Sequence, residues 1–325
     1  MEYLKGGTQK RHYTEDEVVY RPCPLCGALD CTGIAKERGA IGVVRCNACG
    51  MIYVNPRIKE PEKVYWGDAS RYYEEARLIF EGKAAHHRDI NYVRDLDVIE
   101  SIKPTGKLLD IGANMGFFLR HAAKRRWEVT GIEPSPSLSE MARRYFGLDV
   151  RTAFLHDAGF GAETFDIVTL SDVFEHVEDP RGMLAAVRRV LKPDGILFIK
   201  VPNGKYNLLK HRIVRMFKNR ESLNDIFDAY EHLSHFTHDT LQRALTESDF
   251  HIVREFVDIP INLPVWHEYV GQYYLYPSPW TLDVKRRAAR FLFYWISKAE
   301  YWLNFKRAGY FAPNIVVIAR KSADA

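Results

Sequence analysis

The chain has 325 residues with 46% hydrophobic content, enough for a full α/β domain and a smaller module, and we expect two domains. A formal net charge of +4 is too mild to argue by itself for a nucleic-acid partner. Residues 1–20 are polar and no apolar run approaches the ~20 residues that span a bilayer, so we expect neither a signal peptide nor a membrane span, and a cytoplasmic protein.

Residues 1–19 form a polar lead-in, and two Cys-x-x-Cys-Gly sequences follow within residues 20–57. The pairs are Cys23/Cys26 and Cys46/Cys49, with 19 residues between them. This spacing is typical of a zinc ribbon, in which four thiolates fill a tetrahedral site and leave no position open for catalysis. The predicted zinc is therefore structural. Disulfides or reduced buried thiols are the alternative.

Residues 58–100 are predicted to be a largely helical lid or linker. They carry the aromatic side chains Tyr65, Trp66, Tyr72 and Tyr73. Such a cluster has two interpretations, as a cover over a cofactor or substrate pocket and as ordinary core.

The next segment predicts a buried strand, a tight turn and the start of a helix. An apolar run at 108–111 is followed by Gly112 and Gly116, after which the apolar residues resume. Glycine lets the backbone approach a ligand that a Cβ atom would block, and the first turn of a helix offers free N–H groups. A turn of this kind is typical of a nucleotide-binding site.

Further strands and crossover helices follow in regular alternation. The apolar run 129–132 ends at Glu133, whose carboxylate is predicted to bind ribose hydroxyls or, alternatively, to be a solvated charge at a strand end. Strands are predicted at 165–172, 196–201, 250–257 and 314–320, and helices at 116–126, 136–146, 181–191 and 239–248. This order predicts a parallel sheet with crossover helices.

In its motifs the chain resembles the class I S-adenosylmethionine-dependent methyltransferases, specifically the bacterial small-molecule branch. The sequences Asp110-Ile-Gly and Glu175-His-Val-x-x-Pro carry this resemblance. It is tight over about 100–203 and looser to 257 and at 314–320, and the cysteine segment is similar to the N-terminal extension of many members. The resemblance implies a doubly wound, mostly parallel seven-stranded Rossmann-like sheet within residues 101–325, and S-adenosylmethionine as cofactor.

The resemblance also implies the residues that surround the cofactor. The turn after the first strand borders the methionine part, Glu133 holds the ribose, the 152–155 region passes the adenine, and Ser171 and Asp172 close the pocket. Asn114 departs from the family, because many members have glycine there. The implied residues are Asp110, Gly112, Ala113, Asn114, Gly116, Glu133, Phe154, Leu155, Ser171 and Asp172.

Two segments, 203–235 and 260–312, are predicted to be insertions on the substrate side. Between 205 and 220 there are six basic residues and no acid, and 285–307 has seven basic residues and one acid around an aromatic run. Both segments have helical apolar spacing, so each is predicted either to rest on an anionic membrane surface or to pack as a lid or core helix.

Methyl transfer from a sulfonium requires alignment of the acceptor and removal of its proton. Histidine is the natural base near neutral pH. His176, which follows the 165–172 strand, is our first choice, and His232 and His235 are the second. For each of them the alternative is a structural histidine bonded to backbone.

The leading hypothesis is methyl transfer to a small-molecule, sugar or glycolipid acceptor, with O-methylation favoured. Two alternatives are C-methylation of a sugar or of a quinone-like or isoprenoid acceptor at a membrane surface, and RNA methylation with the zinc ribbon and basic helices on the phosphate backbone. RNA is less favoured because no Asn-Pro-Pro-Tyr-like motif is present. A noncatalytic scaffold is the remaining class, and the nearly intact cofactor motifs argue against it.

Overall fold

The computed structural model describes residues 11–60, 76, 79–81, 84–86, 88–217, 225–256, 269–270, 273–275 and 284–322, and the statements below concern those residues. Within them the helices are η2 (Glu15–Glu17), α3 (Asp89–Glu100), α4 (Phe117–Ala123), α5 (Pro136–Phe146), η3 (Phe174–His176), α6 (Pro180–Val190), α7 (Gly204–Phe217), α8 (His238–Thr246) and α9 (Val284–Leu303). The strands of the two N-terminal sheets are β1 (Val18–Val19), β2 (Cys31–Glu37), β3 (Ile41–Cys46), β4 (Ile52–Val54), β5 (Arg57–Ile58) and β12 (Ser234–His235). The remaining strands are β6 (Ala84–His86), β7 (Gly106–Ile111), β8 (Trp127–Ile132), β9 (Val150–Arg151), β10 (Phe165–Ser171), β11 (Leu191–Pro202), β13 (Phe250–Phe256), β14 (Tyr269–Val270), β15 (Tyr273–Leu275) and β16 (Asn314–Lys321).

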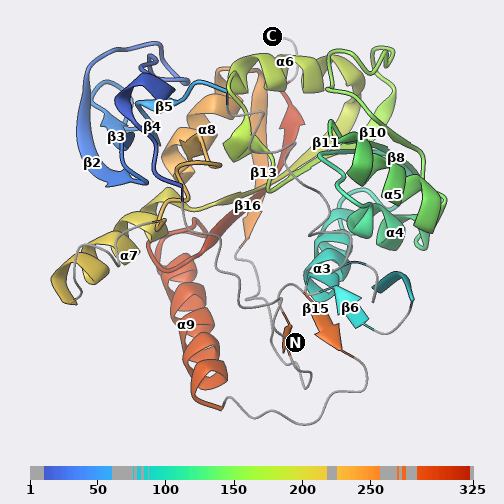
Figure 1. The fold of residues 1–325 in the computed structure, drawn as a ribbon. Coiled ribbons are helices and arrows are strands. Elements are labelled where there is room, and N and C mark those ends of the chain that lie inside the picture. The colour runs from blue at the N-terminus through green and yellow to red at the C-terminus, as the bar shows by residue number, and fades with distance from the viewer. Residues whose placement is uncertain are drawn as a thin grey trace.

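A seven-stranded sheet in the order β13-β16-β11-β10-β7-β8-β9 forms the centre of the molecule (Figure 1). β9, β8, β7, β10 and β11 pair in parallel, and β16 runs antiparallel to both of its neighbours. The strand order reverses direction at β7, because the chain moves outward to β8 and β9 and then returns to β10. The predicted doubly wound, mostly parallel fold is confirmed.

Apolar side chains cover both faces of this sheet, which is why its strands read as continuous apolar runs. In β11 the side chains alternate, with Leu197 and Ile199 on one face and Ile196 and Phe198 on the other. Leucine and valine side chains from α6 and α8 complete the first core, and side chains from α3, α4 and α5 complete the second. The crossover helices therefore form one layer on each face.

The segment 20–57, called the cysteine module below, builds a second sheet in the order β12-β4-β3-β2. β12 comes from residues far along the chain, since Ser234 pairs with Tyr53 and His235 pairs with Ile52. Buried module side chains such as Met51 and Tyr53 belong to the same apolar cluster as α6 and α8. The cysteine module is thus packed against one face of the large sheet.

Two parts of the fold differ from the predicted elements. β11 begins at Leu191 instead of 196, because Leu191 already pairs with Phe165, and a register shift then accommodates the extra residues before Ile196 pairs with Ile167. In the predicted helical region 58–100, the described residues include strand β6 before helix α3. The aromatic residues 65–66 and 72–73 lie outside the described residues, so their lid interpretation stays a prediction.

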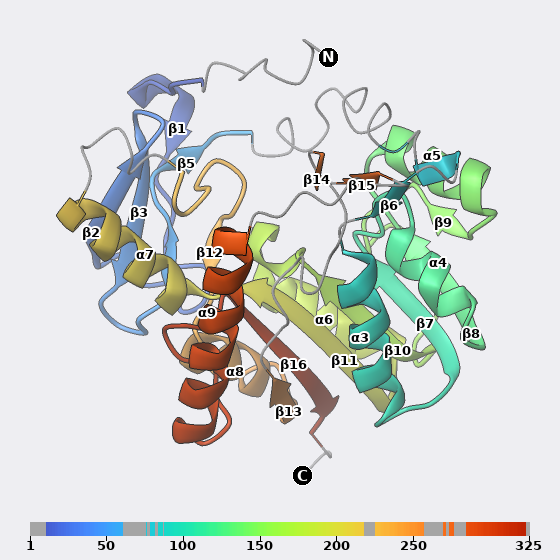
Figure 2. The same ribbon diagram turned by 90° about the horizontal axis from the view of Figure 1, so that it is seen from below.

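Helices α7 and α9 occupy the same side of the molecule as the cysteine module, opposite α4 and α5 (Figures 1 and 2). The start of α7 meets the end of α9, where Lys205 lines a hollow together with Ile296 and Leu303. No helix among the described residues is both long and apolar enough to cross a bilayer.

Candidate functional site

Strand β7 ends in a turn that leads directly into α4. Gly112 and Ala113 donate their N–H groups to the carbonyl oxygen of Ile132, which ties the turn to the end of β8 at 2.9 and 3.0 Å. Gly112 and Gly116 both have positive φ, +73° and +80°. The predicted strand, turn and helix are therefore present, at the carboxyl end of the sheet where its direction reverses.

The glycines of this turn have a packing role that the sequence did not indicate. A Cβ atom on Gly112 would lie 2.4 Å from a methyl carbon of Val173, and one on Gly116 would lie 2.6 Å from Leu148. Both contacts are with the chain's own side chains. The small residue therefore allows close packing of neighbouring segments as well as the left-handed backbone.

Asn114 and Glu133 are joined in the structure. Asn114 has φ +50°, a conformation that asparagine adopts more readily than most residues and that explains its substitution for glycine. Its N–H group donates to Oε2 of Glu133 at 2.9 Å, and the N–H group of Ser135 donates to Oε1 at 2.9 Å. The Glu133 carboxylate is buried and held by two backbone donors, so it is not the solvated strand-end charge of the alternative interpretation.

Asp110 lies at the same edge, one strand away. Its Oδ1 accepts a hydrogen bond from the hydroxyl of Thr169 at 2.6 Å, and its side chain is buried. Burial, with a contribution from the charge of Glu133, raises the pKa of Asp110 to about 7. Burial also raises the pKa of Glu133. Because burial disfavours the charged form of both acids, a ligand that brings hydroxyl donors or positive charge would stabilise them.

The segment predicted to pass the adenine follows β9. Phe154 is 42% exposed and its ring stacks on that of His156, with 5.6 Å between centroids. Leu155 is buried in the apolar cluster that covers one face of the sheet. An exposed aromatic face next to a buried leucine can accept a flat base by stacking.

Asp172 follows β10, at the same edge of the sheet, and lies beside charged side chains from the start of α3 and from β11. Its carboxylate pairs with Arg88, just before α3, and its N–H group donates to the carbonyl of Lys200 at 2.9 Å. Burial alone would raise the pKa of Asp172, but the cations Arg88 and Lys200 outweigh burial and lower it. Lys200 in turn lies 3.2 Å from buried Asp95.

His176 and His232 lie against each other beside this network, with 4.9 Å between ring centroids, and His235 follows at 6.3 Å from His232. Nδ1 of His176 lies 2.9 Å from the carbonyl oxygen of Glu231. A carbonyl can only accept, so Nδ1 carries the proton and, in the neutral ring, the lone pair is on Nε2.

Burial lowers the pKa of all three histidines. For His176 the Glu231 carbonyl and the charges of Glu231 and Asp172 oppose this effect. The pKa falls to about 4 for His232, through burial and the neighbouring His176, and to about 3 for His235. Each ring is therefore neutral at pH 7, as a general base must be.

The side chains of His235 and Glu175 have no hydrogen-bond partner among the described residues, although both are buried. Both carboxylate oxygens of Glu175 are unsatisfied, and one lies 3.9 Å from Nε2 of His176. Burial and the charge of Asp172 raise the pKa of Glu175 well above its ordinary value. The donor atoms of Glu175, His176 and His232 all lie within 4.8 Å of one another.

In the cysteine module, the four sulfur atoms of Cys23, Cys26, Cys46 and Cys49 converge within 4.8 Å of one another. Gly27 and Gly50, with φ +75° and +78°, close the two tight turns. Burial raises the pKa of the Cys46 thiol, but the N–H groups of Cys49 and Ala48 outweigh it and lower that pKa to about 7. Converging sulfurs and inward N–H groups fit a tetrahedral cation, and Cys31 lies outside the group.

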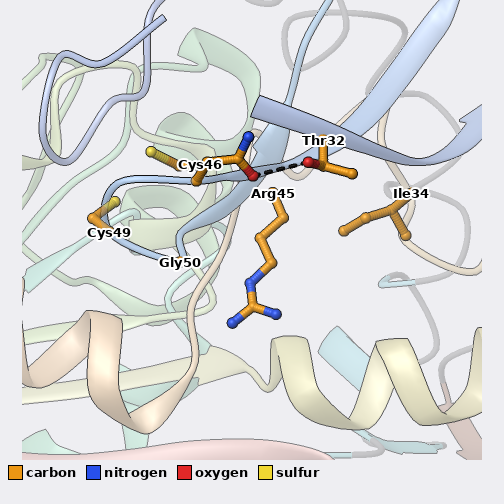
Figure 3. A pocket seen from close by; sticks show the side chains of 7 residues that line it. Thr32, Ile34, Arg45, Cys46, Cys49 and Gly50 are labelled. Atoms are coloured by element: carbon orange, nitrogen blue, oxygen red, sulfur yellow. Dashed lines mark hydrogen bonds between the residues drawn. The ribbon is translucent and has the colours of Figure 1, made fainter. Parts of the chain in front are cut away.

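Hollows also exist away from the sheet edge. One of about 530 Å³ opens beside the second cysteine turn, where Thr32 donates to Asn47 at 2.8 Å and the Arg45 side chain points away from Cys46 and Cys49 (Figure 3). Another of about 550 Å³ lies along α9. Neither involves a predicted cofactor residue.

The structure brings the predicted residues into three groups: the acids and turn at β7 and β8, the histidines beside β10, and the cysteines. Sequence reasoning missed Arg88 and Lys200, whose charges act on Asp172, and Asp95, which pairs with Lys200. Lys200 could have been recognised from the sequence, because it is a charged residue inside an otherwise apolar strand. Arg88 lies in no motif.

Comparison with known proteins identifies the family of the chain. A family model described as "Methyltransferase domain" matches residues 84–255. The "Ubiquinone biosynthesis O-methyltransferase, mitochondrial" of Schizosaccharomyces pombe is 35% identical over 100 residues, covering 29% of this chain and 36% of that protein. The "Ubiquinone biosynthesis O-methyltransferase" of Coxiella burnetii is 30% identical over 131 residues, covering 38% and 56%. The chain spans about half the length of the curated relatives it matches.

Among solved structures, the Burkholderia thailandensis 1,6-didemethyltoxoflavin-N1-methyltransferase aligns with 90% of this chain and 99% of its own, with 14% identity and a TM-score of 0.48. The family match extends over more than half of this chain, from β6 to β13. The chain therefore belongs to the methyltransferase-domain family.

Proposed function

We propose that this protein is an S-adenosylmethionine-dependent enzyme that methylates a hydroxyl oxygen of a small-molecule acceptor, with His176 as general base. The hydrogen bond between Nδ1 of His176 and the Glu231 carbonyl is the observation that carries this proposal, because it puts the proton on Nδ1 and the lone pair of the neutral ring on Nε2. The names of the relatives, which are O-methyltransferases, support transfer to oxygen.

The chain's own residues fit the cofactor. Bound S-adenosylmethionine supplies a methyl group on a positively charged sulfonium. We assign its ribose to Glu133, its methionine part to Asp110 and the turn at Gly112, and its adenine to Phe154 and Leu155. The buried acids provide acceptors for hydroxyl and ammonium donors, and they gain stability when such donors neutralise them.

His176 then acts on the acceptor. A neutral imidazole receives the hydroxyl proton on Nε2 and becomes a cation, which the nearby carboxylate of Asp172 stabilises. Arg88 and Lys200 keep Asp172 ionised for this purpose. His232 packs against the ring of His176 and limits its rotation.

The test begins with the acceptor. Labelled S-adenosylmethionine is incubated with the enzyme and with separate lipid, glycan, small-molecule and RNA fractions, and the fraction that takes up label provides the assay. In that assay His176→Ala is expected to lose roughly 10²–10⁴-fold in kcat. Affinity for S-adenosylhomocysteine should be unchanged, because the residues assigned above to the ribose, the methionine part and the adenine lie at the ends of β7, β8 and β9, whereas His176 follows β10.

The matched control is His251→Ala, which removes an exposed histidine on edge strand β13. It should turn over like the wild type. Retained turnover in His176→Ala would refute the base, and label in the RNA fraction would refute the small-molecule acceptor.

We also propose that the four cysteines bind a structural zinc ion. They offer four sulfur ligands, so no position remains for an acceptor or water.

We further propose that α7 and α9 contact an anionic membrane surface. Apolar side chains are exposed along α9 at Leu292, Trp295, Ile296, Trp302 and Leu303 and just after it at Phe305, the last two at 84% and 89%. Lys306 lies over the Trp302 ring at 5.2 Å, and α7 adds exposed Met216 and Phe217 without any acid. Exposed aromatics with interspersed cations suit an anionic interface.

A further inference from the structure

The cysteine module is joined to residues 225–235, called the histidine loop below, which carry His232 and His235. β12, which contains His235, is a strand of the module's own sheet, and Val54 donates its N–H group to the carbonyl of Leu233 at 3.0 Å. The histidine loop is therefore positioned by the module as well as by the large sheet.

Glu37, the last residue of β2, makes the most buried of these connections. Its side chain is completely buried, with Oε1 accepting from the N–H group of Phe227 at 2.8 Å and Oε2 accepting from that of Ala229 at 3.0 Å. A buried carboxylate that accepts two backbone N–H bonds fixes the position of those backbone groups. Glu37 belongs to neither the predicted cofactor residues nor the histidines, so its contacts indicate a role in holding these two N–H groups.

The hydrogen bonds continue from Glu37 to the histidines. The carbonyl of Asp228, between the two residues that Glu37 holds, accepts the N–H groups of Glu231 and His232, both at 2.9 Å. The carbonyl of Glu231 then accepts the Nδ1 proton of His176. Three residues, Ala229, Asp228 and Glu231, thus connect the carboxylate of Glu37 with the ring of the proposed base.

Two further contacts hold the same region from either side. Arg38 donates to Asp225 through Nε at 2.8 Å and through a second nitrogen at 3.3 Å, and its guanidinium lies 3.3 Å from the centre of the Tyr230 ring. Arg57, at the other end of the module, donates to Glu178 at 3.0 and 2.6 Å, two residues after His176.

We propose that the cysteine module positions the acceptor side of the active site, and that Glu37 is a positioning residue for His176 and His232. The module is then more than a stabilising appendage, because it sets which nitrogen of His176 faces the acceptor. This inference rests on the proposed role of His176.

The experiment replaces Glu37 by glutamine in the full chain. Glutamine keeps one acceptor oxygen but turns an amide donor toward a backbone N–H group, so the turn at 227–229 must shift. The readout is the NMR signal of the histidine ring Cε1–H groups against pH, together with S-adenosylhomocysteine affinity and zinc content. The groups that face His176 are Glu175, Asp172, Glu231 and His232.

In Glu37→Gln, the ring signals of His176 and His232 should shift, and the pKa of His176 should rise toward the ordinary 6.5 as its burial loosens. Cofactor affinity and zinc content should stay as in the wild type. Methyl transfer should fall roughly 10–100-fold in kcat, as expected for a misplaced base. The matched control is Glu15→Gln, an exposed acid near the same module, which should change nothing.

Unchanged ring signals in Glu37→Gln would overturn the inference, as would a parallel loss of cofactor affinity and zinc, which indicates general unfolding. Should that variant not fold, Glu178→Gln tests the module's second connection to the site, since Glu178 is the half-exposed partner of Arg57, and it must shift the His176 signal. The NMR result does not depend on catalysis. Full activity in His176→Ala would therefore refute the base without deciding whether Glu37 positions the ring.

Discussion

Asp110 and Glu133 are two buried acids at adjacent strand ends, and their protonation is linked to folding. Burial favours the neutral form of each carboxyl group, so the folded chain holds these protons to higher pH than the unfolded chain does. The acids make the ligand-free site less stable as pH rises, and the positive charge of a bound cofactor should compensate.

The pKa of Asp110 in the fold is about 7, against an ordinary value of 3.8. Between these values the unfolded chain has already lost the proton that the folded chain retains, so the free energy of unfolding falls as pH rises from about 4 to 7. Asp110→Asn has no proton to lose, and its stability should fall less over the same interval. Urea unfolding without ligand at several pH values measures this.

Exposed Asp149, replaced by asparagine, is the control and should follow the wild type. Equal pH slopes in Asp110→Asn and the wild type would contradict the raised pKa.

At the scale of single residues, the residues in short-range motifs were the most predictable part of the site. Asp110 lies near the end of the β7 run, Glu133 directly follows β8, and His176 comes five residues after β10, so the predicted strands place all three near one edge of a parallel sheet. Arg88 could not be predicted in the same way. Its partner Asp172 is 84 residues away, and only the tertiary fold brings the two side chains together.

At the scale of elements, the cysteine module likewise has one part that the sequence predicts and one part that it does not. The spacing of its cysteines predicts that the four sulfurs meet, because each pair closes its own tight turn. The fourth strand of its sheet, β12, could not be predicted, since a two-residue strand almost 180 residues downstream has no local signal. β11 likewise starts early because pairing with β10 overrides the Pro-Asp-Gly turn signal.

Cys46→Ser removes one of the converging sulfurs. Because zinc binding and folding of such a module are coupled, we expect metal content to fall well below one zinc per chain and Tm to drop by roughly 4 °C or more. Metal analysis and thermal unfolding measure the two effects.

Cys31→Ser is the matched control, since that sulfur lies outside the group of four. It should keep both the zinc and the Tm. A Cys46→Ser protein with the same metal content as the wild type would show that the cysteines do not bind zinc.

For the whole molecule, α7, α9 and the cysteine module lie on one side, and the β8 and β9 edge lies on the other (Figure 2). The basic and aromatic composition of α7 and α9 was evident from the sequence, but their exposure was not. Helical spacing alone cannot distinguish an apolar face that packs from one that stays open, because both have the same period. The exposed fraction of Leu303 and Phe305 makes that distinction.

Membrane contact predicts that the protein sediments with vesicles containing phosphatidylglycerol at low salt, and less at high salt. Replacing Trp302, Leu303 and Phe305 together by serine should abolish sedimentation without lowering Tm, because these side chains are exposed. The control replaces the equally exposed Tyr20 and Leu29 of the cysteine module. Sedimentation of the triple variant at the wild-type level would contradict the membrane contact and would favour a lid role for α9.

The whole account depends on the cofactor lying across the carboxyl ends of β7 and β8, with Glu133 on its ribose. Calorimetric titration with S-adenosylhomocysteine tests this most directly, using wild type, Glu133→Gln and, as control, Glu128→Gln, which changes an exposed acid on the same strand. Losing a charged hydrogen bond of about 1.5–3 kcal/mol should weaken binding by roughly 10–100-fold in Glu133→Gln and leave Glu128→Gln unchanged. Equal affinity in all three proteins, or no binding by the wild type, would contradict it.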